Sequence, residues 1–318
     1  MIEATRLKDR IYATIIGGAI GDSLGVPVEF EARDTFKVTD MLSCKAFNRP
    51  AGTWSDDTSL TLCLVETLIE GGDLDALMGK FSDWNSKGYM TPHGQCFDEG
   101  VITNNAIKAF REGTPANQCG QSGEYDNGNG SLMRIAPVAF LNIEDKNFNG
   151  RLARVEKYSS ITHAHLRSIL GCFIYTEYLR QLYLGKQKVE ALDTVIEIFE
   201  MCSRDFQKYQ AELFHYERIL NGKIMNLSRD EIKSGGYVVH TLEAALWCFL
   251  KNDDYQSSVL EAVNLGHDAD TTGLVAGSMA GMYYGQDGIP SKWVNLLSKI
   301  ETIKELCTGF ADGLAATQ

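Results

Sequence analysis

The chain has 318 residues, of which 44% are hydrophobic, so it can bury a large core. Its formal net charge of −12 argues against a protein that binds nucleic acid or an anionic membrane through a wide basic face. The eight cysteines are dispersed without a Cys-x-x-Cys pair, which favours free thiols in a reducing compartment over a disulfide framework or a zinc site.

No Pro- or Ser-rich linker and no low-complexity tract divides the sequence, so we expect one domain over residues 1–318. Near the N-terminus, basic residues precede the apolar stretch 11–21 and imitate a signal peptide. Glu3 and Asp9 interrupt that basic region, no Ala-x-Ala site follows, and Asp22 ends the apolar run well short of a membrane span. We therefore expect a cytoplasmic protein that does not bind a membrane.

Apolar residues recur every fourth position from Leu7 to Ala19, which predicts a helix over residues 7–25. Glycines follow the same spacing at 17, 21 and 25, and again at 273, 277, 281 and 285. Because a glycine in a helix costs about 1 kcal/mol relative to alanine, two such series indicate close helix–helix contact. We expect these two helices to lie near the centre of the molecule and to converge on the site.

An aperiodic loop over residues 27–52 carries Glu29, and a polar cluster then opens an apolar helix over residues 59–69. The cluster comprises Thr53, Ser55, Asp56, Asp57 and Thr58. Acidic and hydroxyl side chains suit the first turn of a helix, where free backbone N–H groups and the helix dipole favour negative charge. Capping alone would use only one of them.

Residues 81–97 indicate a short helix and a loop, and residues 103–110 a further helix. Asp98 lies between them and is either a helix N-cap or a functional carboxylate. The most loop-like stretch is 125–134, where glycines would let backbone N–H groups approach a phosphate. An ordinary Asn-Gly turn is the alternative reading of that stretch.

Residues 159–183 predict one long helix, on which His163 and His165 point to different faces, and residues 190–220 also read as helical. Tyr237 either closes over a ligand or belongs to the core. A second polar cluster, with Asp268, Asp270 and Thr271, opens the later glycine-rich helix. Residues 293–310 predict one or two covering helices. The fold class is therefore all-α, a single compact multi-helix bundle.

If the two acidic helix starts meet, four carboxylates share one pocket, and like charges that close cannot all stay ionised without cations. Oxygen ligands without cysteine or paired histidine favour hard ions such as Mg²⁺ or Mn²⁺. The alternative is a pair of ordinary capped helices.

Three segments in order, residues 21–30, 55–58 and 268–271, resemble the motifs of the ADP-ribosylglycohydrolase family. The likeness extends from about residue 12 to about residue 285, and it is greatest to the branch of dinitrogenase-reductase-activating and ADP-ribosylarginine hydrolases. His267 departs from the family's Gly-Gly-Asp-x-Asp-Thr pattern, which bears on substrate choice rather than on metal binding. Ser55 replaces the commoner Thr and keeps the oxygen ligand.

The resemblance implies two Mg²⁺ or Mn²⁺ ions held by Ser55, Asp56, Asp57, Asp268, Asp270 and Thr271. It implies catalytic roles for Glu29, Asp57, Asp98 and Asp268. It implies contacts to ADP-ribose from Asn127, Gly128, Asn129, Gly130, Ser131, Met133, His163 and Tyr237, and leaves His165 structural. Residues 97–100 resemble the Phe-Asp-x-Gly of members that act on ADP-ribosylarginine, where the carboxylate would grip a guanidinium or protonate the leaving nitrogen.

The leading hypothesis is a metal-dependent hydrolase that removes ADP-ribose from a modified protein side chain, with arginine favoured over serine. One alternative is a metal-dependent nucleotide or diphosphate hydrolase. Another is a non-catalytic protein that binds ADP-ribose or an ADP-ribosyltransferase, as an immunity protein would. We expect a monomer whose partners are the ADP-ribosylated protein and such a transferase, and no nucleic acid.

Overall fold

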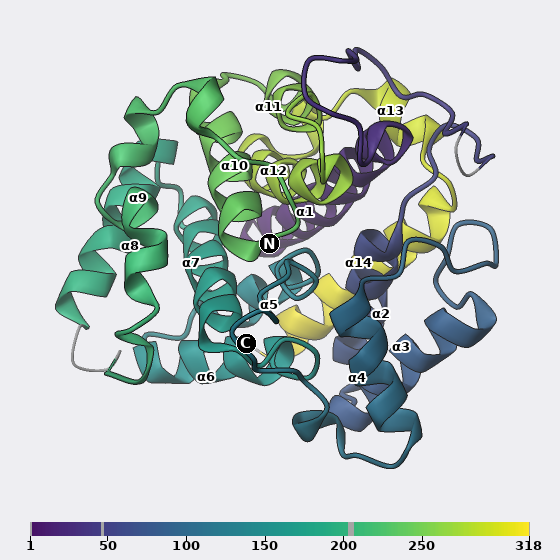
Figure 1. Ribbon diagram of the computed structural model, residues 1–318, viewed down its shortest axis with the longest axis horizontal. Helices are drawn as coiled ribbons and strands as arrows, with labels where there is room; N and C mark the ends of the chain where they lie inside the picture. The colour runs from purple at the N-terminus through teal and green to yellow at the C-terminus, as the bar shows by residue number, and fades with distance from the viewer. Residues whose placement is uncertain (1, 46–47, 203–206, 318) are drawn as a thin grey trace.

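The computed structural model describes residues 2–45, 48–202 and 207–317, and this part of the chain is helical with isolated β-bridges but no strands (Figure 1). In chain order the α-helices are α1 Ile2–Gly25, α2 Asp56–Glu70, α3 Leu74–Lys87, α4 Val101–Arg111, α5 Ala136–Leu141, α6 Phe148–Ser159, α7 Leu166–Tyr183, α8 Lys188–Met201, α9 Glu217–Leu220, α10 Val238–Lys251, α11 Tyr255–Val263, α12 Ala269–Tyr284, α13 Ser291–Leu296 and α14 Ile300–Thr317. Short 3-10 turns lie between several of them. The all-α prediction is confirmed.

Helices α1 and α12 lie side by side at the centre of the molecule, as the two glycine series predicted (Figure 1). A Cβ atom added to Gly21 would lie 2.0 Å from the carbonyl oxygen of Gly273, and one added to Gly281 would lie 1.9 Å from that of Ala13. No side chain fits at either position, so the glycines allow the two backbones to touch. Gly285, the last of the series, instead caps α12 with a φ of 74°.

The first helix passes the length and hydropathy test for a membrane span over Ala4–Val28. The 18-residue window that meets this test is, however, 89% buried inside the protein. The apolar character of α1 is therefore accounted for by its central position against α12 and α14.

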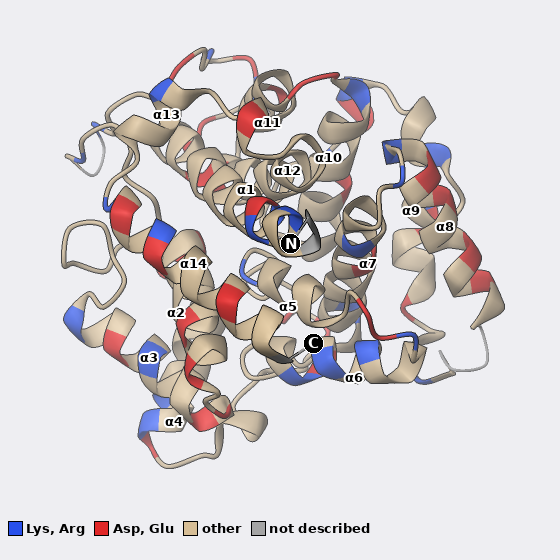
Figure 2. Cartoon of the chain, turned by 180° about the vertical axis from the view of Figure 1, so that it is seen from behind, with Lys and Arg blue, Asp and Glu red and all other residues tan. Residues whose placement is uncertain are grey.

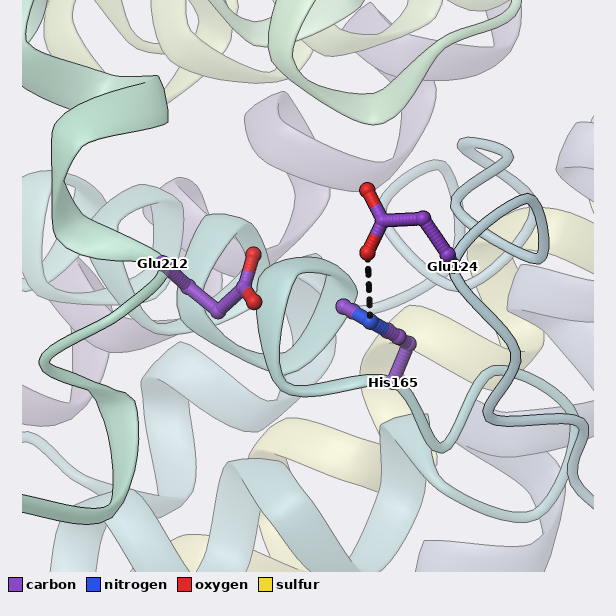
Figure 3. Close-up of side chains that lie close together, drawn as sticks. All are labelled: Glu124, His165 and Glu212. Carbon is purple, nitrogen blue, oxygen red and sulfur yellow. Dashed lines mark ion pairs between the residues drawn. The ribbon is translucent and has the colours of Figure 1, made fainter.

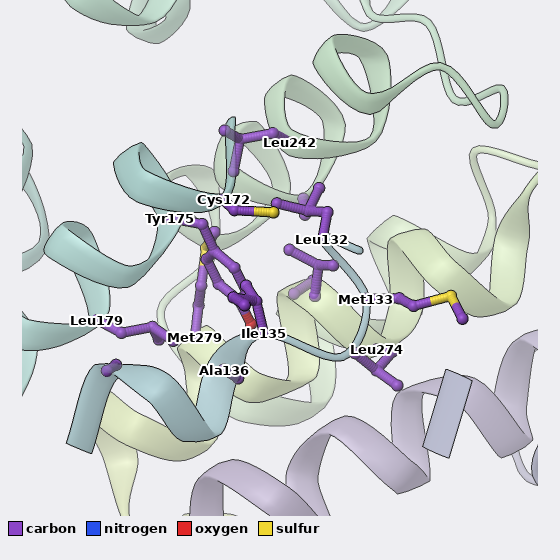
Figure 4. Packing of buried hydrophobic residues seen from close by; sticks show 14 of the residues in the cluster. Leu132, Met133, Ile135, Ala136, Cys172, Tyr175, Leu179, Leu242, Leu274 and Met279 are labelled. Atoms are coloured by element: carbon purple, nitrogen blue, oxygen red, sulfur yellow. The ribbon is translucent and has the colours of Figure 1, made fainter. Parts of the chain in front are cut away.

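Buried apolar residues connect the long helices into a core cluster. Figure 4 shows part of it, where Leu132 and Ile135 pack among Tyr175 of α7, Leu242 of α10 and Met279 of α12. The segment that precedes α5 is thereby anchored to three helices at once. Figure 2 shows acidic and basic residues interspersed along the outer helices. The division of residues 1–318 into a single domain stays a prediction.

Two predicted helices are interrupted. Residues 159–183 form the end of α6, a turn and then α7, whose N-cap is His165. The turn is drawn away from the helix axis by a bridge in which Gln121 N donates to Thr162 O and Ala164 N to Gln121 O. In the second case, α8 ends at Met201, and the described residues from Gln207 to Leu220 form short turns and α9. The covering helices predicted at the C-terminus are α13 and α14.

Candidate active site

The two acidic helix starts meet at one cavity of about 340 Å³. Asp56 and Asp57 line it from the start of α2, and Asp268 and Thr271 line it from the start of α12. Ser55 is the N-cap of α2, and its hydroxyl accepts a hydrogen bond from the N–H of Asp57 at 3.3 Å. The sequence prediction that both starts converge on one pocket is therefore confirmed.

Three carboxylate oxygens at this site are buried and have no hydrogen-bond partner among the described residues: Glu29 Oε2, Asp57 Oδ2 and Asp270 Oδ2. No Lys or Arg of the described chain forms an ion pair with any of these residues. Burial raises the pKa of Asp57 and of Asp270 well above the usual range, and nearby carboxylates raise both further. A hard cation would supply the missing positive charge and use the free oxygens, so these residues fit a metal site.

Asp22 is a buried part of the site; the sequence placed it at the end of an apolar run and within the 21–30 motif, but predicted no role for it. Its carboxylate accepts hydrogen bonds from Ser55 N at 2.9 Å, Thr58 N at 3.1 Å and Thr58 Oγ1 at 2.6 Å. It therefore satisfies the free donors of the first turn of α2 and fixes Asp56 and Asp57 in place. Burial raises its pKa to about 7. The signal in the sequence that could have identified Asp22 as a site residue was an acidic residue inside an otherwise apolar helix.

Glu29 follows a 3-10 turn at Val26–Val28 and lines the cavity. The loop after it is held against the start of α12 by two backbone hydrogen bonds, from Phe30 N to His267 O at 2.7 Å and from His267 N to Glu31 O at 2.8 Å. His267 has a φ of 59°, in the left-handed region where glycine is the usual residue. Burial and the charge of Asp98 raise the pKa of Glu29 to about 9.

Asp98 is not a helix cap, because the N-cap of α4 is Gly100 and no side chain bonds to that terminus. Its φ is 55°, and its carboxylate lies with those of Glu29 and Asp270 in a group whose oxygens come within 4.8 Å of one another. Burial and the charge of Asp268 raise the pKa of Asp98 to about 6. Of the two predicted roles for Asp98, helix N-cap or functional carboxylate, the geometry favours the functional carboxylate.

Part of the predicted ligand-binding loop faces the same cavity. Gly128, Asn129, Gly130 and Met133 line it. The Asn129 amide donates to Asp268 Oδ2 at 2.8 Å and to Thr241 Oγ1 at 2.9 Å, which ties the loop to α10 and to the start of α12. Its backbone N–H donates to Gly236 O at 3.0 Å. The loop is thus held opposite the acidic helix starts.

Three residues predicted to contact the ligand do not line the cavity. Asn127 bonds to Glu124 O and to Ser168 Oγ, and Ser131 accepts from Ser159 Oγ at 2.9 Å beneath the loop. Tyr237 is the N-cap residue of α10, and its hydroxyl lies 3.3 Å from His215 Nδ1. These side chains support the loop from outside the cavity in this structure.

His163 lies in the turn between α6 and α7 and lines the cavity, although its side chain is 2% exposed. A Cβ added to Gly130 would lie 2.8 Å from His163 Cε1. The ring therefore fits against the loop only because residue 130 is a glycine. Burial and the charge of Arg134 lower the pKa of His163 to about 3, which keeps the ring neutral.

A second group with metal-ligand side chains lies outside this cavity and consists of Glu124, His165 and Glu212 (Figure 3). Arg167 donates to Glu124 Oε1 and to Glu212 Oε2, at 2.8 Å in each case. Because the guanidinium of Arg167 already pairs with both carboxylates, this group is an ion-pair network. His165 accepts from Arg167 N as the cap of α7, in agreement with its predicted structural role.

The fold and the cavity together define an all-α protein with a carboxylate-rich site beside a glycine loop. The family model for ADP-ribosylglycohydrolase matches residues 3–318, and the chain belongs to that family. The chain is 33% identical to the ADP-ribosylarginine hydrolase Tri1 of Pseudomonas putida, over 96% of this chain and 78% of that protein. It is 28% identical to the ADP-ribosyl-[dinitrogen reductase] glycohydrolase of Rhodospirillum rubrum, over 93% and 92% of the two chains.

A solved structure titled "ADP-ribosylglycohydrolase-related protein complex" is similar with a TM-score of 0.79 and 29% identity. The match covers 97% of this chain and 99% of that one. These matches extend over nearly the whole chain, and the family model's range includes both acidic helix starts and the glycine loop between them.

Proposed function

We propose that this protein is a metal-dependent hydrolase that cleaves the glycosidic bond between ADP-ribose and a modified protein side chain, with arginine as the acceptor. The observation that carries the proposal is the set of unpartnered carboxylate oxygens on Glu29, Asp57 and Asp270, opposite a glycine loop. Family membership supports the hydrolysis of an ADP-ribosyl bond. The relatives named for ADP-ribosylarginine and for dinitrogen reductase support a protein substrate.

The proposed cofactor is a pair of Mg²⁺ or Mn²⁺ ions. The residues that would hold them are Glu29, Ser55, Asp56, Asp57, Asp268, Asp270 and Thr271. Such ions supply Lewis-acid stabilisation and orient the ribose hydroxyls and a water molecule. Hydroxyl and carboxylate oxygens are the donor set that these ions prefer.

The remaining steps of binding and catalysis can be assigned to groups of the protein itself. Backbone N–H groups of Gly128 and Gly130 would approach the diphosphate, since neither residue has a side chain of its own to prevent it. Glu29 would orient or deprotonate the attacking water. Asp98 would grip the acceptor guanidinium or protonate the leaving nitrogen, and the carboxylates beside the sugar would stabilise an oxocarbenium-like transition state.

The experiment compares an arginine-ADP-ribosylated protein with a serine-ADP-ribosylated one, each incubated with and without a chelator. We expect free ADP-ribose from the arginine conjugate only, and no release once the metal is removed. AMP or phosphate in place of intact ADP-ribose would favour the diphosphate-hydrolase alternative. Tight binding of ADP-ribose without turnover would favour a binding protein and contradict the proposal.

A further inference from the structure

The guanidinium of Arg134 is fully buried directly after the glycine loop, and no carboxylate of the described residues forms an ion pair with it. One terminal nitrogen donates to Tyr158 O at 3.0 Å and the other to Thr162 Oγ1 at 2.8 Å, while Nε has no partner in the described part of the chain. The ring of Phe81 lies 5.0 Å from the guanidinium carbon. A buried cation without a counter-ion is unfavourable, so its position calls for a functional explanation.

The hydrogen bonds lead from Arg134 to the cavity. Thr162 Oγ1 lies 2.8 Å from His163 Nδ1. Arginine can only donate, so Thr162 Oγ1 accepts from Arg134, and its own hydrogen then has His163 Nδ1 as its acceptor. If Nδ1 carried the ring proton instead, two donors would point at Thr162 and the hydroxyl hydrogen would be buried without an acceptor. This series of hydrogen bonds therefore favours a neutral His163 ring with its proton on Nε2.

The other ring nitrogen faces the glycine loop. A Cβ added to Gly130 would lie 3.2 Å from His163 Nε2, and one added to Gly128 would lie 3.5 Å from it. The ring lines the cavity, and no hydrogen bond of the described residues reaches Nε2. A proton on Nε2 would thus be offered to a ligand oxygen beside the loop.

We propose that Arg134 and Thr162 are positioning residues that hold His163 in the neutral Nε2–H tautomer, so that the ring donates a hydrogen bond to an oxygen of ADP-ribose. The identity of the ligand rests on the proposed function, whereas the tautomer rests on the hydrogen bonds alone. The charge of Arg134 polarises the hydrogen bonds that run through Thr162 to His163, which makes Nε2–H a stronger donor.

The first test is NMR of the ligand-free protein at neutral pH with ¹⁵N-labelled histidine rings, the His163 signals being assigned by their loss in H163Q. We expect a protonated Nε2 and an unprotonated Nδ1. A proton on Nδ1, or a doubly protonated ring, would overturn the proposal. This measurement involves neither metal nor ADP-ribose, so its result is independent of the proposed function.

The second test measures ADP-ribose affinity by calorimetry in T162V, which keeps the side-chain shape but not the hydroxyl. We expect mixed His163 tautomers and about tenfold weaker binding, with both properties restored in T162S. T176V is the matched control, because Thr176 is also fully buried but its hydroxyl donates only within α7, to Cys172 O at 3.0 Å and Phe173 O at 3.2 Å.

A T162V protein with the wild-type tautomer and affinity would contradict the positioning role. Thermal unfolding of T162V and T176V separates a loss of affinity from a loss of folding, and T162S tests the hydroxyl in a chain that keeps every hydrogen bond. If wild type does not bind ADP-ribose at all, the proposed function fails, and the NMR result alone still decides the tautomer.

Discussion

Two groups of potential metal-ligand side chains in this molecule are both closely spaced but have different surroundings. Glu124, His165 and Glu212 place their ligand atoms within 4.8 Å of one another, and so do Glu29, Asp98 and Asp270. Around the first group, Arg167 reaches both carboxylates. Around the second, no described Lys or Arg forms an ion pair, and buried oxygens of Glu29 and Asp270 have no donor.

The comparison teaches that the proximity of carboxylates does not by itself indicate a metal site, whereas the absence of an internal counter-charge distinguishes the group that fits one. The paired group is complete within the protein, and Glu124 is exposed to solvent. The unpaired group can remain buried only if it takes up protons or cations from outside. Substitutions and metal removal should therefore affect the two groups differently.

The largest expected effect is on catalysis. D270N should lower the rate of ADP-ribose release on the order of 10³-fold, because it removes one of the unpartnered carboxylates from the site. E212Q is the matched control in the paired group and should keep wild-type activity. The measurement is product release from an arginine-ADP-ribosylated protein at saturating Mn²⁺. Equal losses in both variants would break the distinction between the two groups.

Metal should stabilise the folded protein through the unpaired group only. At a free Mn²⁺ concentration 100 times the dissociation constant, one site adds about 2.7 kcal/mol to the free energy of unfolding. The increase should persist in E212Q and largely disappear in D270N, as followed by thermal denaturation with and without chelator. An undiminished response in D270N would place the ion elsewhere.

The sequence could predict the parts of this site that are local. Each acidic helix start is contiguous, and the glycine spacing that brings α1 against α12 is visible as a pattern, so the convergence of the two starts was predictable. The contribution of Asp22 was not, because its partners, Ser55 and Thr58, are more than thirty residues away. A carboxylate that caps a different helix has no periodic signature.

The break between α6 and α7 was missed for a related reason. Residues 159–183 satisfy helical periodicity locally, but Thr162 is drawn into long-range bonds with Gln121 and Arg134. Tertiary contacts thus override propensity at the turn that carries His163. Asp98 could not be decided from sequence either, because its positive φ turns it from the start of α4 toward Glu29.

Removal of the internal counter-charge should destabilise the paired group. R167M leaves Glu212, which is largely buried, without its cation, and we expect a loss of about 1–2 kcal/mol in the free energy of unfolding. In chelator, D57N at the unpaired group should be neutral or stabilising, because it replaces a buried carboxyl group that is unfavourable when ionised. Chemical denaturation of both variants at neutral pH shows whether each substitution raises or lowers the free energy of unfolding. A stabilised R167M or a strongly destabilised D57N would contradict the electrostatic reading.

The last comparison is the pH dependence of stability. The pKa values of Glu29, Asp22 and Asp98 are raised to about 9, 7 and 6, so the metal-free folded state binds more protons than the unfolded chain above pH 4. In chelator, stability should therefore be greatest near pH 5 and fall as the pH rises toward 9. Saturating Mn²⁺ should flatten or reverse this slope, because a cation favours the ionised carboxylates. Denaturation midpoints between pH 5 and pH 9 measure it, and a chelated protein that gains stability over this range would show that these carboxylates are ionised without a metal.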